Sequence, residues 1–329
     1  MTTTDLHPAR SAQRSQIIGV TSAFAIGTLV AIQSRINGDL GHRLGDGIVA
    51  ALISFVSGLV ILGIACAVVP GIRRSLANVW QAIRSRSKWQ LRWWQCIGGL
   101  AGAFLVASQG ITVAVIGVAV FTVAAVAGQA ATSLLVDRLG FGPAGPQLIT
   151  PLRVVGALLA VVAVVLAVSE QLSHPSGLLL AVLPALGGIA TAVQQAINGR
   201  VARTASPDAY GAFAAGTINF IVGTSALLVV FLVDLVLRGA PRSLPTEPWL
   251  YVGGACGVIF ISAAATVVRV VGVFVLGMGT IAGQLIASLL IDLFIPASHN
   301  AVTAQVVAGT SLALVAVVIA ATPNLRQAG

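Results

Sequence analysis

Apolar residues fill the chain in blocks of about 20, and short polar stretches separate the blocks. The blocks are continuously apolar and lack the alternation of a barrel strand, so each one predicts a helix. A helix of about 20 residues is long enough to cross the ~30 Å hydrocarbon layer of a bilayer. We therefore predict an all-α membrane protein of ten transmembrane helices, at residues 16–39, 47–70, 94–115, 117–137, 150–169, 176–199, 209–237, 249–270, 273–294 and 302–322.

The positive residues between the blocks predict the orientation of the helices. With the N-terminus inside, fourteen arginine and lysine residues fall on the inner side and four on the outer side. Cytoplasmic loops of membrane proteins carry such an excess. We therefore predict a multi-pass protein of a bacterial-type cytoplasmic (inner) membrane. Both termini are expected in the cytoplasm, with residues 1–15 as a cytoplasmic tail.

The longest connection, residues 71–93, holds six of these charges and three tryptophans. Its apolar residues recur at helical spacing, at Ile72, Leu76, Val79, Trp80 and Ile83. This pattern is typical of an interfacial helix on the inner leaflet, where anionic lipids attract positive charge. Membrane lipids are thus expected partners, and an orientation anchor is favoured over a regulatory lipid sensor.

Segments of the first half recur in the second half. AIQSRINGDL at 31–40 matches AVQQAINGRV at 192–201, and AGQAATSLLVD at 127–137 matches AGQLIASLLID at 282–292. Weaker matches align the second predicted helix with the seventh and the fifth with the tenth. These matches predict a duplicated unit.

The duplication divides the chain into two five-helix repeats, residues 16–169 and 176–322. Because five is an odd number, the second repeat is expected to enter the membrane upside down. Inverted repeats of this kind are common in secondary transporters, in which the two halves exchange conformations and open the bundle to each side in turn.

Composition and charge exclude several other classes. Of the residues, 57% are apolar and only 8% are charged, whereas soluble domains carry roughly 25% charged residues. The net charge of +9 lies beside the apolar blocks, so topology and lipid explain it without nucleic acid. No nucleophile with an acid–base partner and no metal-ligand spacing is found, so we expect no enzyme, no cofactor and no metal site.

Two motifs carry a resemblance to a known family. A Q-x3-N-G sequence closes the first helix, and AGQ-x3-SLL-[IV]-D lies in the fourth. With the duplicated unit, they resemble the drug/metabolite transporter superfamily, and within it the YdcZ-like branch of inner-membrane exporters, over residues 16–322. The resemblance implies a secondary-type transporter that moves a small polar metabolite by alternating access, with export favoured. Small multidrug members carry a glutamate in the first helix, which is missing here, so the resemblance does not extend to exchange of a cation for protons.

Polar side chains within the predicted helices are candidate sites, because burying them in hydrocarbon is costly unless they find partners. Gln129 and Gln284 lie nearly halfway along the fourth and ninth helices, and Ser133 and Ser288 follow one turn further along the same face. They either line a substrate cavity at the membrane midplane or form hydrogen bonds between helices. The sequence favours neither interpretation.

A second set of polar residues lies near the ends of the first and sixth helices. Gln33 and Asn37 are one turn apart in the first, and Gln194 and Asn198 repeat them in the sixth. In an inverted pair these residues would form gates on opposite sides of the membrane. For the asparagines a helix C-cap is favoured instead, because Asn-Gly tolerates the left-handed conformation. The glutamines are the better gate candidates.

The charged residues at the helix ends complete the list. Arg35 is expected to pair with Asp39 or Asp292 rather than to attract an anionic substrate. Because no Asp or Glu lies mid-helix, with Asp137 and Asp292 at helix ends, we expect amides and hydroxyls to recognise a neutral or zwitterionic molecule. The alternative functions are a passive facilitator or channel, and a non-transporting membrane scaffold.

Overall fold

The computed structural model describes residues 6–85, 91–141, 149–167, 169, 175–296 and 302–325. All regular elements in these ranges are helical, as the sequence predicts. In chain order they are α1 (Leu6–Leu44), α2 (Gly47–Val68), α3 (Pro70–Arg84), η1 (Trp93–Cys96), α4 (Gly99–Arg138), α5 (Pro151–Ala167), α6 (Pro175–Ala205), α7 (Ala209–Arg238), η3 (Pro248–Tyr251), α8 (Gly253–Phe294) and α9 (Ala304–Leu325).

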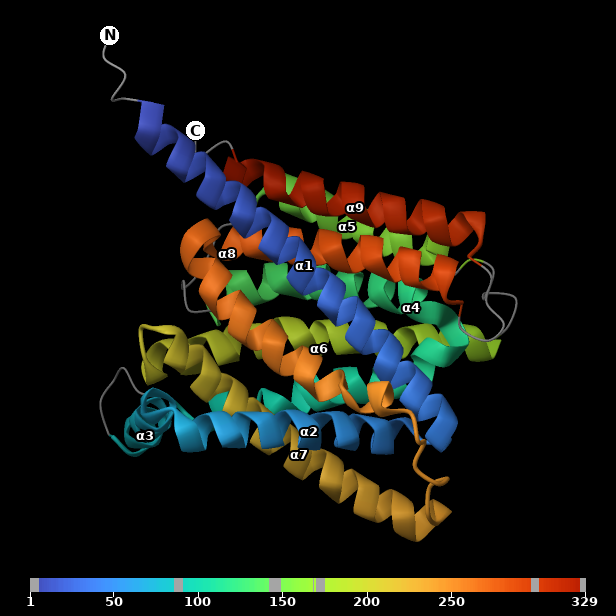
Figure 1. Ribbon diagram of the computed structural model, residues 1–329. Helices are drawn as coiled ribbons and strands as arrows, with labels where there is room; N and C mark the ends of the chain where they lie inside the picture. Colours follow the sequence, from blue (N-terminus) through green and yellow to red (C-terminus); the bar gives the residue numbers. More distant parts are fainter. Residues whose placement is uncertain are drawn as a thin grey trace.

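Two of the helices, α4 and α8, are long enough to cover two predicted helices each. Within α4, Gly117 has φ 81° and ψ 164°, so the helical path breaks where the sequence predicts a turn. Glycine takes this backbone conformation without the steric cost of a Cβ. The α8 helix also folds back, since its first residues lie beside Asn37 and Pro296, just beyond its last residue, lies beside Arg35 (Figure 1). The side chains around the turn predicted near Gly272 lie outside the described residues.

Length and apolar composition suit several helices for crossing a bilayer. Among the described residues, four segments meet both criteria: Gly47–Val68, Trp93–Val136, Leu180–Ala205 and Ala209–Arg238. Shorter apolar helices occupy Pro151–Ala167, Gly279–Phe294 and Ala304–Ala320. Most of the predicted spans therefore coincide with apolar helices.

The predicted C-caps at Asn37 and Asn198 are wrong. The α1 helix continues through Asn37 to Leu44, and α6 continues through Asn198 to Ala205. The left-handed glycine that follows α1 is Gly45, with φ 67°. Packing against neighbouring helices overrides the local tendency of Asn-Gly to end a helix, and it leaves both asparagine side chains inside the bundle.

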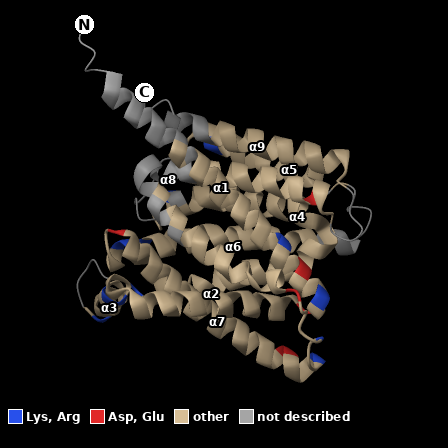
Figure 2. Ribbon diagram, viewed as in Figure 1, with Lys and Arg blue, Asp and Glu red and all other residues tan. Residues whose placement is uncertain are grey.

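The helices run between two ends of the bundle, which we call the α1–α2 end and the α6–α7 end after the turns found there (Figure 1). The α1 helix begins, and α9 finishes, at the α6–α7 end. Figure 2 shows that basic residues dominate this end, whereas basic and acidic residues mix at the other. The arginines that the sequence assigns to the inner side are among those at the α6–α7 end. The described charged side chains there are Arg73, Arg74, Arg84, Arg92, Arg138, Arg153, Arg200, Arg203 and Asp208, against Arg35, Arg43, Arg238, Arg242, Asp39, Asp46, Asp234, Glu247 and Asp292 at the α1–α2 end.

The predicted amphipathic helix is present as α3 and lies at the α6–α7 end (Figure 1). Its Ile72 and Val79 are buried, and Val79 packs with residues of α6 and α7. The Asn78 side chain donates a hydrogen bond of 2.9 Å to the carbonyl of Ala205 at the end of α6. Trp80 is exposed on the other side, so α3 has a protein-facing surface and a free surface that carries a large aromatic ring.

The two repeats pack against each other through exchanged contacts. A Cβ on Gly27 of α1 would collide with the backbone of Thr280 in α8, and a Cβ on Gly188 of α6 would collide with that of Ala125 in α4. Gly188 and Ala125 are the residues that the sequence repeat aligns with Gly27 and Thr280. Each repeat thus receives the other's fourth predicted helix against its own first.

The same exchange occurs where equivalent helices meet. Phe55 of α2 and its counterpart Phe220 of α7 stack with ring centroids 5.0 Å apart. At the opposite edge, α5 and α9 lie side by side (Figure 1), with Gly156 against Ala316 and its counterpart Gly309 against Ala163. The contacts of one repeat are therefore reproduced by the other with the roles reversed.

Candidate functional site: a central cavity

A cavity of about 500 Å³ lies between the two repeats. Residues of α1, α2, α4, α6, α7 and α8 line it, so both repeats contribute to its wall. A volume of this size falls within the range of ligand sites for small molecules.

Five of the eight predicted site residues line this cavity. The structure places the amides of Gln129 and Gln284 on the same cavity, although they belong to different repeats. Gln33, Gln194 and Asn198 line it as well. The amides expected at the midplane and those expected at the gates therefore share one wall.

The other three predicted residues lie off the lining. Ser133 and Ser288 donate their hydroxyls to the carbonyls of Ala130 and Leu285, one turn back on their own helices. Asn37 lies behind the wall and is fully buried. The predicted amide–hydroxyl stripes therefore do not both reach the cavity, because the glutamines line it and the serines do not.

Asn37 belongs to a chain of buried hydrogen bonds that closes the cavity toward the α1–α2 end. Ser54 donates to the Asn37 amide oxygen over 2.8 Å, and Asn37 donates to the Gln109 amide oxygen over 2.7 Å. Gln109 in turn donates to the Ser34 hydroxyl over 3.0 Å. We call these four residues the Asn37 group. Asn37 is 0% exposed and Gln109 is 2% exposed, and every member has a partner, which is the condition for burying polar groups at low cost.

The equivalent residues of the second repeat form a looser set on the cavity wall. Gln194 and Asn198 both donate to the Asn219 amide oxygen, over 2.8 and 3.1 Å. Nearby, Gln129 donates to Gln195 over 3.0 Å. We call Gln194, Gln195, Asn198 and Asn219 the Asn198 group. Its members line the cavity, and Gln195 is exposed.

Two cavity amides have no partner of their own. Among the described residues, the side chains of Gln33 and Gln284 form no hydrogen bond within the protein, although both line the cavity. An amide offers two N–H donors and one oxygen acceptor. Gln33 and Gln284 are therefore the wall amides whose full hydrogen-bonding capacity is left for a bound molecule.

The rest of the lining is largely apolar. Rings of Phe55, Phe121, Phe220 and Phe260 contribute to it. Among the described residues that line the cavity, none carries a charge. Such a wall suits a molecule with an apolar body and a small number of uncharged hydrogen-bonding groups.

Sequence reasoning missed Gln109, Gln195 and Asn219. Each is an amide inside an apolar helix, so the rule that flagged Gln129 applies to them equally. Their counterparts in the other repeat are Ala264, Ser34 and Ser54. The internal repeat therefore does not mark them, as it marks the amides that occur in both copies.

Asp292 is fixed by the broken helix α4. Its carboxylate accepts hydrogen bonds from the backbone N–H groups of Val118, over 3.0 Å, and Ala119, over 2.6 Å. These groups follow Gly117 and start the second half of α4, where a helix leaves N–H donors unpaired and an anion is favoured. Asp292 is therefore a helix cap outside the cavity, and the side chain of its counterpart Asp137 lies outside the described residues.

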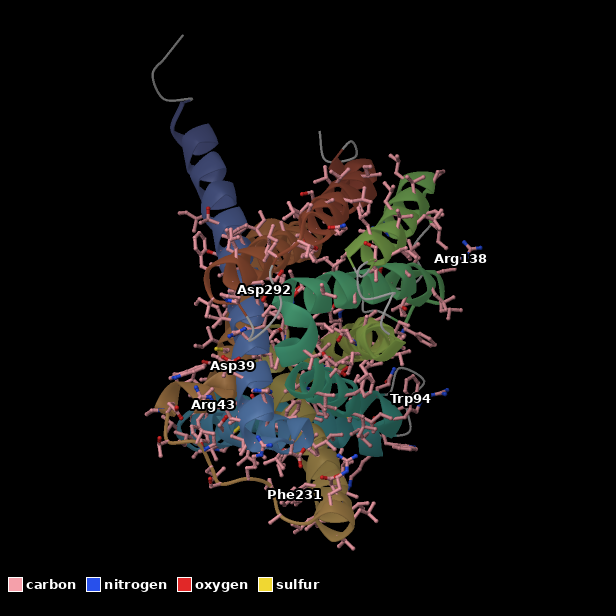
Figure 3. All side chains as sticks on the ribbon, turned by 90° about the vertical axis from the view of Figure 1, so that its right-hand side faces the viewer. Asp39, Arg43, Trp94, Arg138, Phe231 and Asp292 are labelled. Carbon is pink, nitrogen blue, oxygen red and sulfur yellow. The ribbon has the colours of Figure 1, made fainter. Side chains whose placement is uncertain are left out.

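The expected pairing of Arg35 is confirmed for Asp39. Their side chains are 3.1 Å apart, one turn along α1. Figure 3 shows Asp39 and Arg43 on α1, with Asp292 of α8 nearby at the α1–α2 end. Arg35 is thus part of a charged cluster at that end and does not line the cavity.

Long apolar helices around a cavity with an uncharged, hydrogen-bonding wall are features that membrane transporters of small molecules share. The chain belongs to the family described as "Putative inner membrane exporter, YdcZ", whose family model matches residues 18–166 and, a second time, residues 179–319. The double match confirms the predicted resemblance and duplication. No curated protein matches the chain. The protein is accordingly a multi-pass inner-membrane protein of an exporter family.

Proposed function

We propose that the protein exports a small uncharged metabolite by alternating access, with ten membrane crossings in two inverted five-helix repeats. Three observations support this arrangement: the family model matches twice, the contacts between the repeats are reciprocal, and α4 and α8 both fold back. A unit of five crossings reverses its direction when it is repeated, which gives a pseudo-two-fold axis in the membrane plane.

The α6–α7 end faces the cytoplasm in this proposal. Its charged side chains are mostly arginines, and positive charge accumulates on the cytoplasmic side of membrane proteins. Both termini and α3 then lie in the cytoplasm, with the exposed Trp80 of α3 at the lipid surface. Tryptophan favours that depth.

The cavity then faces the cytoplasm in this conformation. Its lining extends to Ala202 and Ala212, three residues from the ends of α6 and α7. Toward the outer side the lining stops at Ser34 in α1 and Ser54 in α2. Gly41 and Gly47, the counterparts of Ala202 and Ala212, are not part of it. A facilitator with a continuous pore would need lining at both ends, so one closed end favours alternating access.

The single observation that carries the substrate proposal is the pair of unpartnered amides, Gln33 and Gln284, on an uncharged wall. Each can make one or two hydrogen bonds with a solute, while the phenylalanine rings hold its apolar part. A cation or anion would be buried without a counter-charge, which costs far more than burying an amide or hydroxyl. The proposed substrate is therefore an uncharged amide or alcohol with an apolar body.

The first test is ligand binding to the purified protein. A panel of small uncharged amides and alcohols, zwitterionic amino acids and organic cations is screened for thermal stabilisation in detergent, because binding to the folded state raises its stability. The compounds that stabilise are then measured for flux in proteoliposomes. We expect saturable flux and counterflow of an uncharged compound. Stabilisation by cations alone, or flux that never saturates, would contradict the proposal.

A matched pair of variants tests the residues. Gln33→Ala/Gln284→Ala removes two hydrogen-bonding groups and is expected to weaken binding about tenfold or more, at about 0.5–1.5 kcal/mol for each bond. Ser133→Ala/Ser288→Ala changes hydroxyls that bond only to their own helices, so binding should stay within about twofold. Equal effects of the two double variants would remove Gln33 and Gln284 from the site.

A further inference from the structure

The α1–α2 end is closed by helices that approach too closely for any residue but glycine. Beyond the Asn37 group, a Cβ on Gly41 of α1 would collide with the Gly110 carbonyl of α4. A Cβ on Gly47 of α2 would lie 2.6 Å from the Gly110 carbonyl carbon, and one on Gly110 would lie 2.7 Å from the Gly47 oxygen. All three collisions involve backbone atoms, which cannot rotate away as a side chain can.

The opposite end lacks each of these features. The counterparts of Gly41, Gly47 and Gly110 are Ala202, Ala212 and Ala265. The counterpart of Gln109, which joins Asn37 to Ser34 in the closed end, is Ala264. The Gln109–Gly110 dipeptide of the first repeat is thus Ala264–Ala265 in the second.

The difference between the two ends affects the stability of their closed forms if the repeats exchange conformations. This inference rests on the proposed alternating-access function. When the inner end closes, α6, α7 and α8 must pack as α1, α2 and α4 do now. Three methyl groups would then stand where the closed end has none, and α8 would contribute no glutamine to the amides, because Ala264 replaces Gln109. The inner closure is therefore the less stable of the two.

We propose that the Gln109–Gly110 dipeptide, replaced by Ala264–Ala265 in the second repeat, makes the cytoplasm-facing conformation the resting state of the transporter. Gln109 supplies the buried hydrogen bonds and Gly110 the close approach. Gln109 also borders the cavity, so the test below measures the accessibility of the two ends and not substrate binding. The resting protein then presents its cavity to the side from which an exporter collects its cargo.

The test exchanges the two dipeptides. The variant Gln109→Ala/Gly110→Ala/Ala264→Gln/Ala265→Gly is made in a background without Cys66, Cys96 and Cys256. Two cysteine reporters are used singly. Val113→Cys replaces a side chain that is 0% exposed and packs against Gly38 in the closed end. Ala212→Cys lies on the cavity lining near the α6–α7 end. Their reaction rates with an impermeant maleimide are measured from the outer and the inner side of membrane vesicles, respectively.

The expected result is an opposite change of the two rates. A hydrogen bond between membrane helices is worth about a threefold change in population, so the two bonds of Gln109 predict about a tenfold shift. The exchange should raise the reaction rate of the cysteine in Val113→Cys about tenfold. It should lower the reaction rate of the cysteine in Ala212→Cys by a similar factor. The second-repeat change alone, Ala264→Gln/Ala265→Gly, leaves the packed outer end untouched and should shift both rates in the same directions by a smaller factor. Gel filtration checks that each variant is folded.

The other outcomes separate the two proposals. If folded exchange variants leave both rates unchanged, the resting-state inference is overturned and the exporter proposal stands. If Val113→Cys already reacts as fast as Ala212→Cys before the exchange, the resting state is also wrong. If both rates rise or fall together in every variant, the ends do not alternate, and the proposed mechanism itself fails.

Discussion

The Asn37 group and the Asn198 group occupy equivalent positions in the two repeats, yet only the first is sealed. Each contains an asparagine from the first helix of its repeat and a polar residue from the second, Ser54 in one and Asn219 in the other. The four residues of the first set are buried and hydrogen-bonded, although Ser34, Ser54 and Gln109 border the cavity. In the second set, Gln194 and Asn198 are half-buried and Gln195 is exposed. Equivalent asparagines on corresponding helices therefore have different surroundings.

The difference lies in the neighbouring helix. The first half of α4 brings Gln109 and Gly110 to the Asn37 group, while α8 has Ala264 and Ala265 at the equivalent positions. A buried asparagine is stable only if another polar group reaches it. Whether the asparagine is buried or lines the cavity thus depends on the residues that the facing helix, α4 or α8, brings to it.

The largest expected loss of stability concerns Gly27 and Gly188, which make equivalent close contacts in the two repeats. Gly27→Ala and Gly188→Ala should each destabilise the protein by about 1–3 kcal/mol or more, because each new Cβ collides with backbone atoms of the facing helix. The two losses should be similar, and thermal unfolding in detergent measures them. A large loss in one variant and none in the other would break the symmetry from which the comparison starts.

The next effect tests the two groups directly. Asn37→Ala removes a buried amide that joins Ser54 to Gln109, and it should lower the free energy of unfolding by about 1–3 kcal/mol. Asn198→Ala removes a half-buried amide whose place water can take, so its cost should be about 0.6 kcal/mol. Thermal unfolding of both variants provides the measurement. If Asn198→Ala proved the more costly, the assignment of sealed and open ends would be reversed.

A smaller effect is expected at the break in α4. Asp292→Ala removes the acceptor for two backbone N–H groups, and loss of a helix cap costs about 0.5–2 kcal/mol. Asp292→Asn keeps one acceptor oxygen and should recover part of that loss. Since Asp292 does not line the cavity, ligand affinity per folded molecule should stay unchanged in both. A selective loss of binding would place the carboxylate in the transport chemistry.

The smallest effect is a pH dependence in the connection between α7 and η3. The pKa of Glu247 lies below its ordinary value because its own backbone N–H and the Arg43 side chain hydrogen-bond to the carboxylate. A lowered pKa contributes stability above the ordinary value of about 4.3, and this contribution disappears as the pH falls through the pKa of the folded state. Arg43→Gln should therefore lower the unfolding temperature slightly at pH 7 and by less at pH 3. An equal difference at both pH values would show that the pair does not titrate.

The helices and their duplication could be predicted because their signals are local. Continuous apolar blocks mark the helices, the isolated Gly117 marks the break in α4, and shared letters such as AGQ and SLL mark the two copies. A break needs only one residue without a Cβ, so its position can be read from the sequence alone.

The connections made by side chains could not be predicted in the same way. The sequence places Ser133 and Ser288 on the faces of Gln129 and Gln284, but one turn along each helix the neighbours change, and the hydroxyls turn back to their own backbone. Gln109 acquires its role only when α4 meets α1. Such pairings depend on which helices become neighbours, and motif spacing does not encode that.

The central claim is that two copies of one unit cross the membrane in opposite directions. Ser85 and Ser243 are exposed residues in the connections that precede η1 and η3, which occupy matching places in the two repeats. Single cysteines at these positions, in a background without other cysteines, are treated with an impermeant maleimide in intact cells and after lysis. An inverted second repeat predicts that Ser243→Cys reacts in intact cells and Ser85→Cys only after lysis. Reaction of both under the same condition would place the two connections on one side of the membrane and contradict the inverted arrangement.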